Sequence, residues 1–378
     1  IPGEHVANMG NAKPKVIPEI MEWYSSTAQK GQNYTLTGGS RIVAPASLTD
    51  VANEVKADIK DLFGFELSVV SSGAGAGDIE LVLDASKANE GFDDETYLME
   101  VTDKVVITGA HATGVYWGTR SALQALKLSG GKNTIPQGTA RDYPEFRLRG
   151  YVMDVGRKPV SMDMLYDIVK NMAWYKLNDF HVHLNDNLIQ IERYGYTNNN
   201  CTQEQYDEGN RAYAGFRLES SLKEETGANP LASRDFHYTK AEFSQFITDS
   251  EKLGVTIVPE IDVPAHAKAI TDAWPSLREP KNFNIHALND HFNLSGKFDE
   301  CLAKTEEIFN DYIDDGTFHS GIVHFGADEY YPDSTLYRKF HKAMIDYLKG
   351  KNVTVRTWGS LSRMSSNAPD VQYNKEET

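Results

Sequence analysis

The sequence predicts an α/β fold, with a small α+β domain over residues 1–144 followed by a barrel of parallel strands over residues 145–378. From residue 147 onward, short apolar segments alternate with segments of helical periodicity, a pattern typical of parallel strands joined by helices. Polar residues follow these strands, and strand ends converge at one end of a barrel. The chain has 378 residues, 40% of them hydrophobic, which is enough for two cores.

Composition excludes several classes of function. The chain carries 38 basic and 54 acidic residues, a net charge of -16, which disfavours binding to nucleic acid or to an anionic membrane surface. No apolar run approaches the length of a membrane span. Two cysteines, Cys201 and Cys301, exclude a disulfide scaffold and fit no zinc spacing, while one bridge and two free thiols both stay open. The first residue, Ile1, is compatible with a signal peptide that has been removed.

The predicted elements of the first domain follow a lead-in over residues 1–30. We expect strands at 41–43, 66–70 and 78–83, a helix at 47–63, a hairpin formed by 97–101 and 104–107, and a helix at 113–128. The glycine-rich run at 71–77 lacks the Lys-Ser/Thr ending of a phosphate-binding loop and leads into a strand, so we interpret it as a plain loop. This domain shows no reactive group of residues.

The predicted elements of the second domain alternate regularly. Strands are expected at 148–155, 180–184, 255–261, 321–326 and 353–358, with a sixth beginning near 371. Helices are expected at 161–175, 239–254, 298–312 and 336–348, and Thr239 with Glu242 forms a capping box. Residues 188–238 form a long insertion with weak periodicity, and a loop of that length usually shapes a binding site.

Polar residues recur at the ends of the predicted strands. They are Asp154 and Arg157, then His183 and Asp186, then Glu260, Asp262 and His266, then Asp328 and Glu329, and finally Trp358. Alone, the pair Asp328–Glu329 is equally well explained as a solvated strand end. Because strand ends converge on one pocket in a barrel, the repeated pattern favours a functional site.

The spacing of the two carboxylates limits the chemistry. Neighbouring residues on a strand point to opposite faces, so Asp328 and Glu329 reach one pocket only at a bent strand tip. That geometry suits one proton donor and one orienting carboxylate better than an acid and a nucleophile on either side of a glycosidic bond. A metal site built from His181, His183, His266 and Asp328 is the alternative. Metal-dependent amidohydrolases place their His-x-His on the first barrel strand, whereas here it follows the second, so we predict no metal and no other cofactor.

Four segments in order resemble the signatures of glycoside hydrolase family 20, the β-N-acetylhexosaminidases and lacto-N-biosidases. They are RGYVMDVGR at residues 149–157, HLNDN at 183–187, DVPAH at 262–266 and HFGADE at 324–329. The resemblance covers roughly residues 95–378. It implies a (β/α)8 TIM barrel and a retaining, substrate-assisted exo-glycosidase that removes β-linked GlcNAc or GalNAc from the non-reducing ends of glycans through an oxazolinium intermediate.

The resemblance also implies roles for individual residues. Glu329 matches the general acid/base, with a pKa expected to be raised, and Asp328 matches the residue that orients the substrate's acetamide. Asp186 and His266 match the pair behind Glu329, and Arg157 matches the arginine that binds sugar hydroxyls. The remaining expected substrate-site residues are Trp358, a wall of the acetamide pocket or ordinary barrel packing, the supporting histidines His183 and His324, and Tyr330. His181 is either a core histidine or a sugar contact.

Departures from the family pattern leave the substrate open. Gly326-Ala327, Asp186-Asn187 and Ala265-His266 replace the usual Gly-Gly, Asp-Asp and Gly-His, and these variants look more like the lacto-N-biosidase branch, which releases lacto-N-biose. A non-catalytic glycan-binding module on the same fold is the alternative from another class. The family's later strands do not follow in the chain, so we expect that the rest of the barrel belongs to a second segment or chain or was lost from this one. An oligosaccharide substrate favours an extracellular or cell-surface location.

Overall fold

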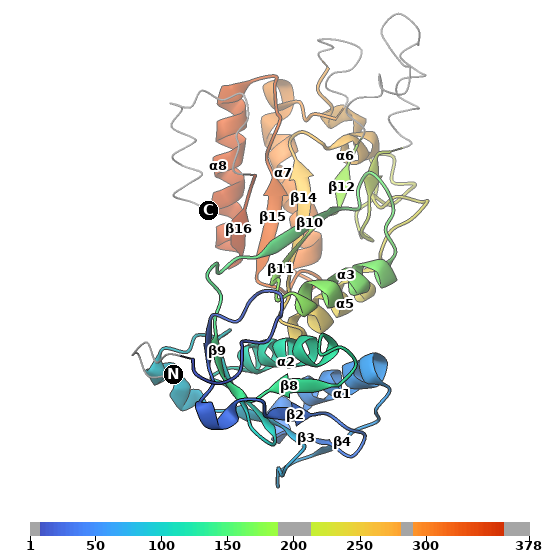
Figure 1. The fold of residues 1–378 in the computed structure, drawn as a ribbon. Coiled ribbons are helices and arrows are strands. Elements are labelled where there is room, and N and C mark those ends of the chain that lie inside the picture. The colour runs from blue at the N-terminus through green and yellow to red at the C-terminus, as the bar shows by residue number, and fades with distance from the viewer. Residues whose placement is uncertain (1–7, 188–212, 281–289, 359–378) are drawn as a thin grey trace, which may run out of the picture. The chain divides into compact units, whose positions relative to one another are not determined.

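The computed structural model describes residues 8–187, 213–280 and 290–358. Part of the predicted insertion, Cys201 and the predicted sixth strand near residue 371 lie outside this range. The chain divides into two compact units, each described here by itself (Figure 1). The first comprises residues 1–149, 168–178 and 252–255, and the second comprises 150–167, 179–251 and 256–378. The predicted boundary near residue 144 stays a prediction. No helix of the described residues is long and apolar enough to cross a membrane.

The first unit contains a seven-stranded mixed sheet in the order β1-β9-β6-β7-β5-β3-β4 and a two-stranded sheet of β2 and β8. Its strands are β1 (Glu22–Tyr24), β2 (Asn33–Thr35), β3 (Arg41–Val43), β4 (Ser68–Val70), β5 (Ile79–Leu83), β6 (Tyr97–Val101), β7 (Val105–Gly109), β8 (Thr134–Pro136) and β9 (Gly138–Asp142). Its helices are α1 (Thr49–Phe63), α2 (Ala112–Lys127) and the 3-10 turns η1 (Thr27–Gln29), η2 (Ala46–Leu48) and η3 (Ala85–Glu90). The predicted hairpin is present as β6 and β7, which pair antiparallel.

The second unit contains a five-stranded parallel sheet in the order β10-β11-β14-β15-β16 (Figure 1). The strands are β10 (Gly150–Asp154), β11 (Asp179–His183), β14 (Thr256–Val263), β15 (Ile322–Gly326) and β16 (Thr354–Arg356), and a small antiparallel pair consists of β12 (Asn185–Asp186) and β13 (Gly215–Phe216). β11 and β15 are buried at every residue, as expected for strands of a parallel sheet covered on both faces.

Helices separate the strands of the parallel sheet in the chain. They are α3 (Met162–Trp174), α5 (Lys240–Lys252), α6 (Lys268–Ala273), the 3-10 turn η5 (Pro275–Leu277), α7 (Leu294–Ile313) and α8 (Ser334–Gly350). The capping box predicted for α5 is present: the Glu242 amide donates to the Thr239 hydroxyl at 3.1 Å, and the Thr239 amide donates to the Glu242 carboxylate at 2.9 Å. The amide of Met164 donates to the hydroxyl of Ser161, so Ser161 caps α3.

The register of the parallel sheet places four polar residues in one row near the carboxyl ends of the strands. Asp154 lies opposite His183, His183 opposite Glu260, and Glu260 opposite His324. β14 then has one extra residue relative to β15 between Glu260 and Val263, a bulge of the kind that redirects side chains beside functional sites. The register therefore places a continuous row of polar residues at the carboxyl end of the sheet, where the sequence predicts the active site.

Candidate active site

A pocket of about 310 Å³ lies within the second unit at the carboxyl end of the parallel sheet. It is lined by Val152, Asp154, Arg157, His183, Asp186, Asp262, His266, Asp328, Glu329 and Trp358. Seven of the nine residues predicted for the site are among these; His324 and Tyr330 are the two that are not. The fold thus brings together residues that lie on or shortly after five different strands.

A bent strand tip carries Asp328 and Glu329 into the same pocket. After β15 ends at Gly326, the backbone has positive φ at Gly326 (69°), Ala327 (65°) and Glu329 (47°), which breaks the alternation of side chains along the strand. His266 Nε2 lies 3.3 Å from Glu329 Oε2 and 3.7 Å from Asp328 Oδ1, so one imidazole faces both carboxylates. His291 Nε2 lies 3.2 Å from the Glu329 carbonyl oxygen and supports the unusual backbone there.

Asp186 and His266 form a buried pair behind Glu329. His266 Nδ1 lies 3.1 Å from Asp186 Oδ1, and His183 Nε2 lies 2.7 Å from Asp186 Oδ2. Burial alone would raise the pKa of Asp186, but the hydrogen bonds from His183 and His266 bring that pKa to about 2. Burial alone would lower the pKa of His266, but its contacts with Asp186 and Glu329 carry the pKa well above the usual value. The carboxylate and the imidazolium therefore stabilise each other's charged forms.

Arg157 is held with its guanidinium at the pocket wall. Its Nη1 lies 2.7 Å from Asp154 Oδ2 and 2.8 Å from Asp186 Oδ2, and its Nε donates to the Asn187 carbonyl at 2.8 Å. Gly156 permits this approach, because a Cβ there would lie 2.5 Å from the Asp186 amide nitrogen. A guanidinium fixed from several sides offers its remaining N–H groups in a defined direction, which suits recognition of sugar hydroxyls.

Trp358 lies at the pocket over two buried histidines. Its ring stacks on His181 with centroids 5.1 Å apart and meets His324 edge-on at 4.9 Å. The amide of Trp358 donates to the carbonyl of Gly326 at 3.0 Å, which ties it to the strand tip that carries the two carboxylates. His181 and His324 are buried and do not line the pocket, so in this structure both lie beneath the tryptophan.

Asp262 is a pocket residue with unusual electrostatics. It is buried on β14, and its Oδ1 accepts a hydrogen bond from the Ala327 amide at 3.2 Å. Burial, and next the nearby charge of Asp328, raise its pKa well above the usual value, so the neutral acid is the favoured form. Burial also raises the pKa of Asp328, with Glu260 and Glu329 adding to the effect.

Tyr330 does not line the pocket, although it follows Glu329 in the chain. Its side chain is buried, and its hydroxyl donates to the Phe292 carbonyl at 2.9 Å. The turn at positive φ that directs Glu329 into the pocket directs Tyr330 toward the interior. In this structure Tyr330 supports the strand tip, and its predicted contact with substrate stays a prediction.

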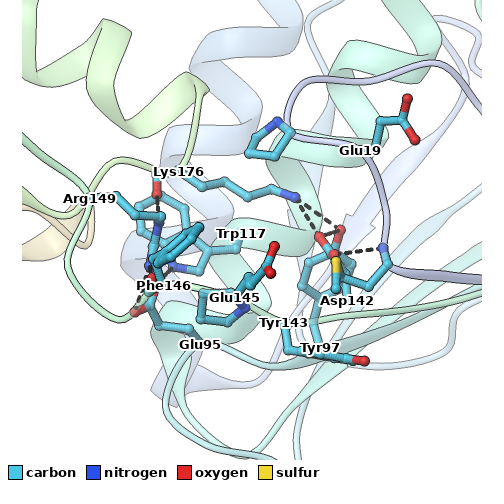
Figure 2. Close-up of a pocket in the computed structure, with 13 residues that line it drawn as sticks. Glu19, Glu95, Tyr97, Trp117, Asp142, Tyr143, Glu145, Phe146, Arg149 and Lys176 are labelled. Atoms are coloured by element: carbon cyan, nitrogen blue, oxygen red, sulfur yellow. Dashed lines mark hydrogen bonds and ion pairs between the residues drawn. The ribbon is translucent and has the colours of Figure 1, made fainter.

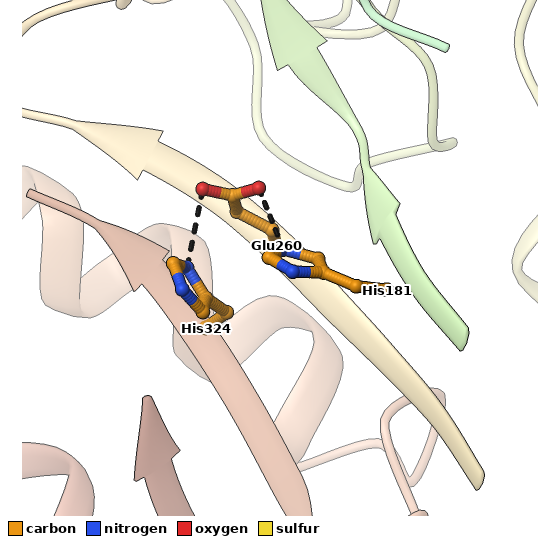
Figure 3. A group of neighbouring side chains, drawn as sticks. All are labelled: His181, Glu260 and His324. Carbon is orange, nitrogen blue, oxygen red and sulfur yellow. Dashed lines mark hydrogen bonds and ion pairs between the residues drawn. The ribbon is translucent and has the colours of Figure 1, made fainter. Parts of the chain in front are cut away.

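Clusters that offer three possible metal ligands occur among the described residues, and one of them is His181, Glu260 and His324 (Figure 3). His181 Nε2 lies 2.7 Å from Glu260 Oε2, and His324 Nδ1 lies 3.1 Å from Glu260 Oε1. The first separation is that of a hydrogen bond, whereas His324 Nδ1 accepts a hydrogen bond from the Gly326 amide and lies beside Glu260 without one. The predicted absence of a metal stays a prediction.

A second cavity, of about 380 Å³, lies within the first unit (Figure 2). Four of its charged groups pair with one another: the buried Lys176 donates to Asp142 at 2.7 Å, and Arg149 forms an ion pair with Glu95. The indole of Trp117 also donates to Glu95, at 2.9 Å. Groups that satisfy one another in this way have a structural role.

Sequence comparison identifies the family of the chain. The model described as "Glycosyl hydrolase family 20, catalytic domain" matches residues 146–368, and "Glycosyl hydrolase family 20, domain 2" matches residues 13–143. The chain belongs to glycosyl hydrolase family 20. The resemblance drawn from the four segments is confirmed, and so is the fold class of a small N-terminal domain followed by a TIM-barrel catalytic domain.

Relatives of this family 20 chain include a lacto-N-biosidase of Bifidobacterium bifidum, 25% identical over 84% of this chain and 24% of the relative. A beta-hexosaminidase of Vibrio furnissii is 24% identical over 78% of this chain and 46% of the relative. The chain thus spans about a quarter to a half of these relatives. The structure of an N-acetyl-beta-hexosaminidase of Streptomyces plicatus matches with a TM-score of 0.70 and 21% identity, covering 93% of this chain and 68% of the other, which shows the fold.

Three carboxylates at the site were not among the predicted site residues. Asp154 and Asp262 line the pocket, and Glu260 lies directly beneath it between three histidines. All three were visible in the sequence as polar residues at strand ends. Their positions beside the pocket depend on the register between strands that are distant in the sequence. No local sequence pattern predicts that register.

Proposed function

We propose that this family 20 chain provides the active site of a retaining, substrate-assisted glycosidase that removes β-linked N-acetylhexosamine from the non-reducing ends of glycans. The observation that carries the proposal is the side-by-side placement of Asp328 and Glu329 at a bent strand tip, both facing His266. The names of the hexosaminidase relatives support the same reaction class.

The other carboxylates at the pocket argue for a nucleophile supplied by the substrate. Asp154 is ion-paired with Arg157, Asp186 is held between two histidines, and burial favours neutral Asp262. Among the residues that the structure describes at this pocket, these contacts leave Asp328 and Glu329. A double-displacement glycosidase needs its nucleophile about 5 Å across the scissile bond from the acid. Adjacent residues of one strand tip do not provide that arrangement, whereas the acetamide oxygen of the substrate does.

The proposed mechanism assigns one task to each carboxylate. Asp328 orients the acetamide and stabilises positive charge on its nitrogen while the acetamide oxygen attacks the anomeric carbon. Glu329 protonates the leaving oxygen and then removes a proton from the water that opens the oxazolinium ion. His266 and Asp186 hold Glu329 in place, Arg157 binds sugar hydroxyls, and Trp358 forms a wall of the acetamide pocket.

The substitution Glu329→Gln tests this proposal against a non-catalytic glycan-binding module. With an aryl β-GlcNAc substrate, we expect kcat to fall by at least about 10²-fold, the usual scale of general acid–base catalysis, while binding of GlcNAc is largely kept. Wild-type protein with its barrel complete that binds GlcNAc without hydrolysing any aryl glycoside of GlcNAc, GalNAc or lacto-N-biose would instead support the binding module.

Release of lacto-N-biose is the second candidate function. The lacto-N-biosidase of Bifidobacterium bifidum matches 84% of this chain, and the Ala327 and Asn187 variants point the same way. A panel of aryl glycosides of GlcNAc, GalNAc and lacto-N-biose separates the candidates. The one with the highest kcat/KM identifies the preferred donor.

We also propose that further strands complete the barrel, and that the protein acts outside the cell or at its surface. Among the described strands, β10 and β16 form the two edges of the parallel sheet, and Tyr151 and Val152 on β10 are 46% and 44% exposed. Exposed apolar edge strands favour pairing with another strand. If residues 1–378 alone form a stable, fully active monomer, the proposed completion is wrong; fractionation of the native host tests the location.

A further inference from the structure

Five ionisable side chains form a continuous series from the interior of the sheet to the proposed acid. The series runs Glu260, His183, Asp186, His266 and Glu329. His183 Nδ1 contacts Glu260 Oε2 directly, and His183 Nε2 lies 2.7 Å from Asp186 Oδ2. Carboxylates and imidazoles alternate along the series, so each charge has opposite charges as its neighbours.

The contacts of His183 determine its protonation. Each of its two ring nitrogens faces a carboxylate oxygen, and a neutral imidazole has only one N–H to donate. Burial alone would lower the pKa of His183, but the charge of Glu260, and next the contact with Asp186, raise the pKa well above the usual value. His183 is therefore a buried imidazolium that donates to both carboxylates.

His324 cannot replace His183 as the balancing cation of Glu260 (Figure 3). The Gly326 amide donates to His324 Nδ1 at 3.0 Å, so this nitrogen is an acceptor. Burial lowers the pKa of His324, which favours the neutral ring. His181 contributes a single contact at 2.7 Å, from Nε2 to Glu260 Oε2. Glu260 has no solvent-exposed surface, and a buried carboxylate without a cationic partner is strongly destabilising.

We propose that Glu260 is a positioning residue of the active site, whose buried carboxylate keeps His183 doubly protonated so that His183 fixes Asp186, and Asp186 in turn fixes His266 against Glu329. Glu260 lines no part of the pocket. Its effect reaches Glu329 through three intermediate side chains. The parallel register sets the start of the series, because Glu260 lies directly opposite both His183 and His324.

Other charged groups face this series from the packed elements. Arg157 contacts Asp186 at 2.8 Å. Asp154 and Asp262 each have a carboxylate oxygen within 4.8 Å of a ring nitrogen of His183. Asp328 lies 3.7 Å from His266. Glu260 and Asp186 balance His183, because each of them contacts one of its two ring nitrogens directly.

Nuclear magnetic resonance tests the charge of His183 without reference to turnover. In protein with ¹⁵N-labelled histidine at pH 7.5, we expect His183, assigned by its loss in His183→Asn, to show both ring N–H groups. In Glu260→Gln, which keeps the size of the side chain but removes its charge, we expect one of the two N–H groups to be lost. In Glu260→Asp, which keeps the charge, both should remain. Wild-type His183 with a single N–H overturns the proposal, even if neither Glu260 variant folds.

Kinetic measurements test whether Glu260 affects the action of Glu329 as the acid. This test rests on the proposed function. With an aryl β-GlcNAc substrate, Glu260→Gln should lower kcat by about 10- to 100-fold while KM changes less than about threefold, because positioning of the acid matters in the transition state. Glu260→Asp should recover part of the loss. The matched control is Asp142→Asn, which neutralises a buried carboxylate paired with Lys176 in the first unit and should lower thermal stability with kcat and KM unchanged.

The outcomes separate the two proposals. If the wild type hydrolyses no aryl N-acetylhexosaminide, the proposed function fails, while the resonance of His183 still tests its link to Glu260. If the wild type is active and folded Glu260→Gln keeps wild-type kcat, the positioning role is refuted. A change in KM alone, with kcat retained, refutes it as well.

Discussion

Gly326 is the position at which one added methyl group should disable the site while the protein stays folded. Gly326 has φ of 69°, and a Cβ built there would lie 1.7 Å from Asp262 Oδ1 and 2.3 Å from Asp262 Cγ. Asp262 is 1% exposed and accepts the Ala327 amide hydrogen bond, so it has little freedom to withdraw. In Gly326→Ala, either Asp262 or the strand tip must move by about 1 Å or more.

The energetic cost follows from two contributions. Left-handed backbone costs a non-glycine residue about 1–2 kcal/mol, and an added group in a packed interior costs about 1–3 kcal/mol. Together they amount to roughly 2–5 kcal/mol, less than the total stability of many domains, about 5–15 kcal/mol. A displacement of 1 Å at a catalytic group can lower the rate by about 10²-fold. We therefore expect a folded protein with a melting temperature lowered by several degrees and with kcat reduced by about two orders of magnitude.

Gly321→Ala is the matched control. Gly321 has φ of 76°, immediately before β15, and no heavy atom of the described residues lies within 4 Å of the place that a Cβ would take there. It therefore carries the backbone cost of about 1–2 kcal/mol without the collision. Thermal melts and Michaelis kinetics with an aryl β-GlcNAc should show both variants destabilised and only Gly326→Ala inactive. Wild-type kcat in Gly326→Ala would refute the packing argument.

Three further predictions concern single groups. Arg157→Lys keeps the charge but loses the guanidinium fork that bridges Asp154 and Asp186, so KM for an aryl β-GlcNAc should rise about tenfold; an unchanged KM would exclude Arg157 from sugar binding. Because the pKa of Asp186 is lowered to about 2, its contribution to stability is complete above the unfolded value near ~4 and is lost as the pH falls toward 2. Urea unfolding at pH 6 and pH 2.5 measures how much the free energy of unfolding falls between these two pH values. This fall should be smaller in Asp186→Asn than in the wild type by on the order of 2 kcal/mol. Equal falls in the two proteins would contradict this prediction. Cys301 is a free, buried thiol whose pKa burial raises to about 12. In a Cys201→Ser background it should react with a thiol reagent at pH 8 only after unfolding, and prompt reaction of the native protein would show that it is accessible.

Local patterns in the sequence predicted the elements that have local causes. The capping box of α5 and the hairpin of β6 and β7 formed as expected, because their stabilising contacts lie within a few residues. β1, a three-residue strand within the lead-in, was not predicted. Its residues are half-buried without alternation, and its pairing with β9 joins segments more than 100 residues apart. Such a strand is defined by its partner and not by its own pattern.

The sequence predicted the site residues whose type indicates their chemistry. It did not predict those whose place at the site depends on the register between strands or on the direction of the backbone. Asp328 and Glu329 were expected to share a pocket only at a bent tip, and the positive φ values of Ala327 and Glu329 provide that bend. The same bend turns Tyr330 inward to Phe292, which adjacency in the sequence could not show. Glu260 gained its importance only when the sheet placed it opposite His183 and His324.

The most direct test of the central claim compares two aryl β-glycosides that differ only at C2. One carries the acetamido group and the other a hydroxyl group. If Asp328 holds a nucleophile that belongs to the substrate, wild-type protein should hydrolyse the acetamido compound with kcat/KM at least about 10³-fold higher, because the other compound lacks the attacking oxygen. Comparable turnover of both would contradict substrate assistance and would require a nucleophile from the protein.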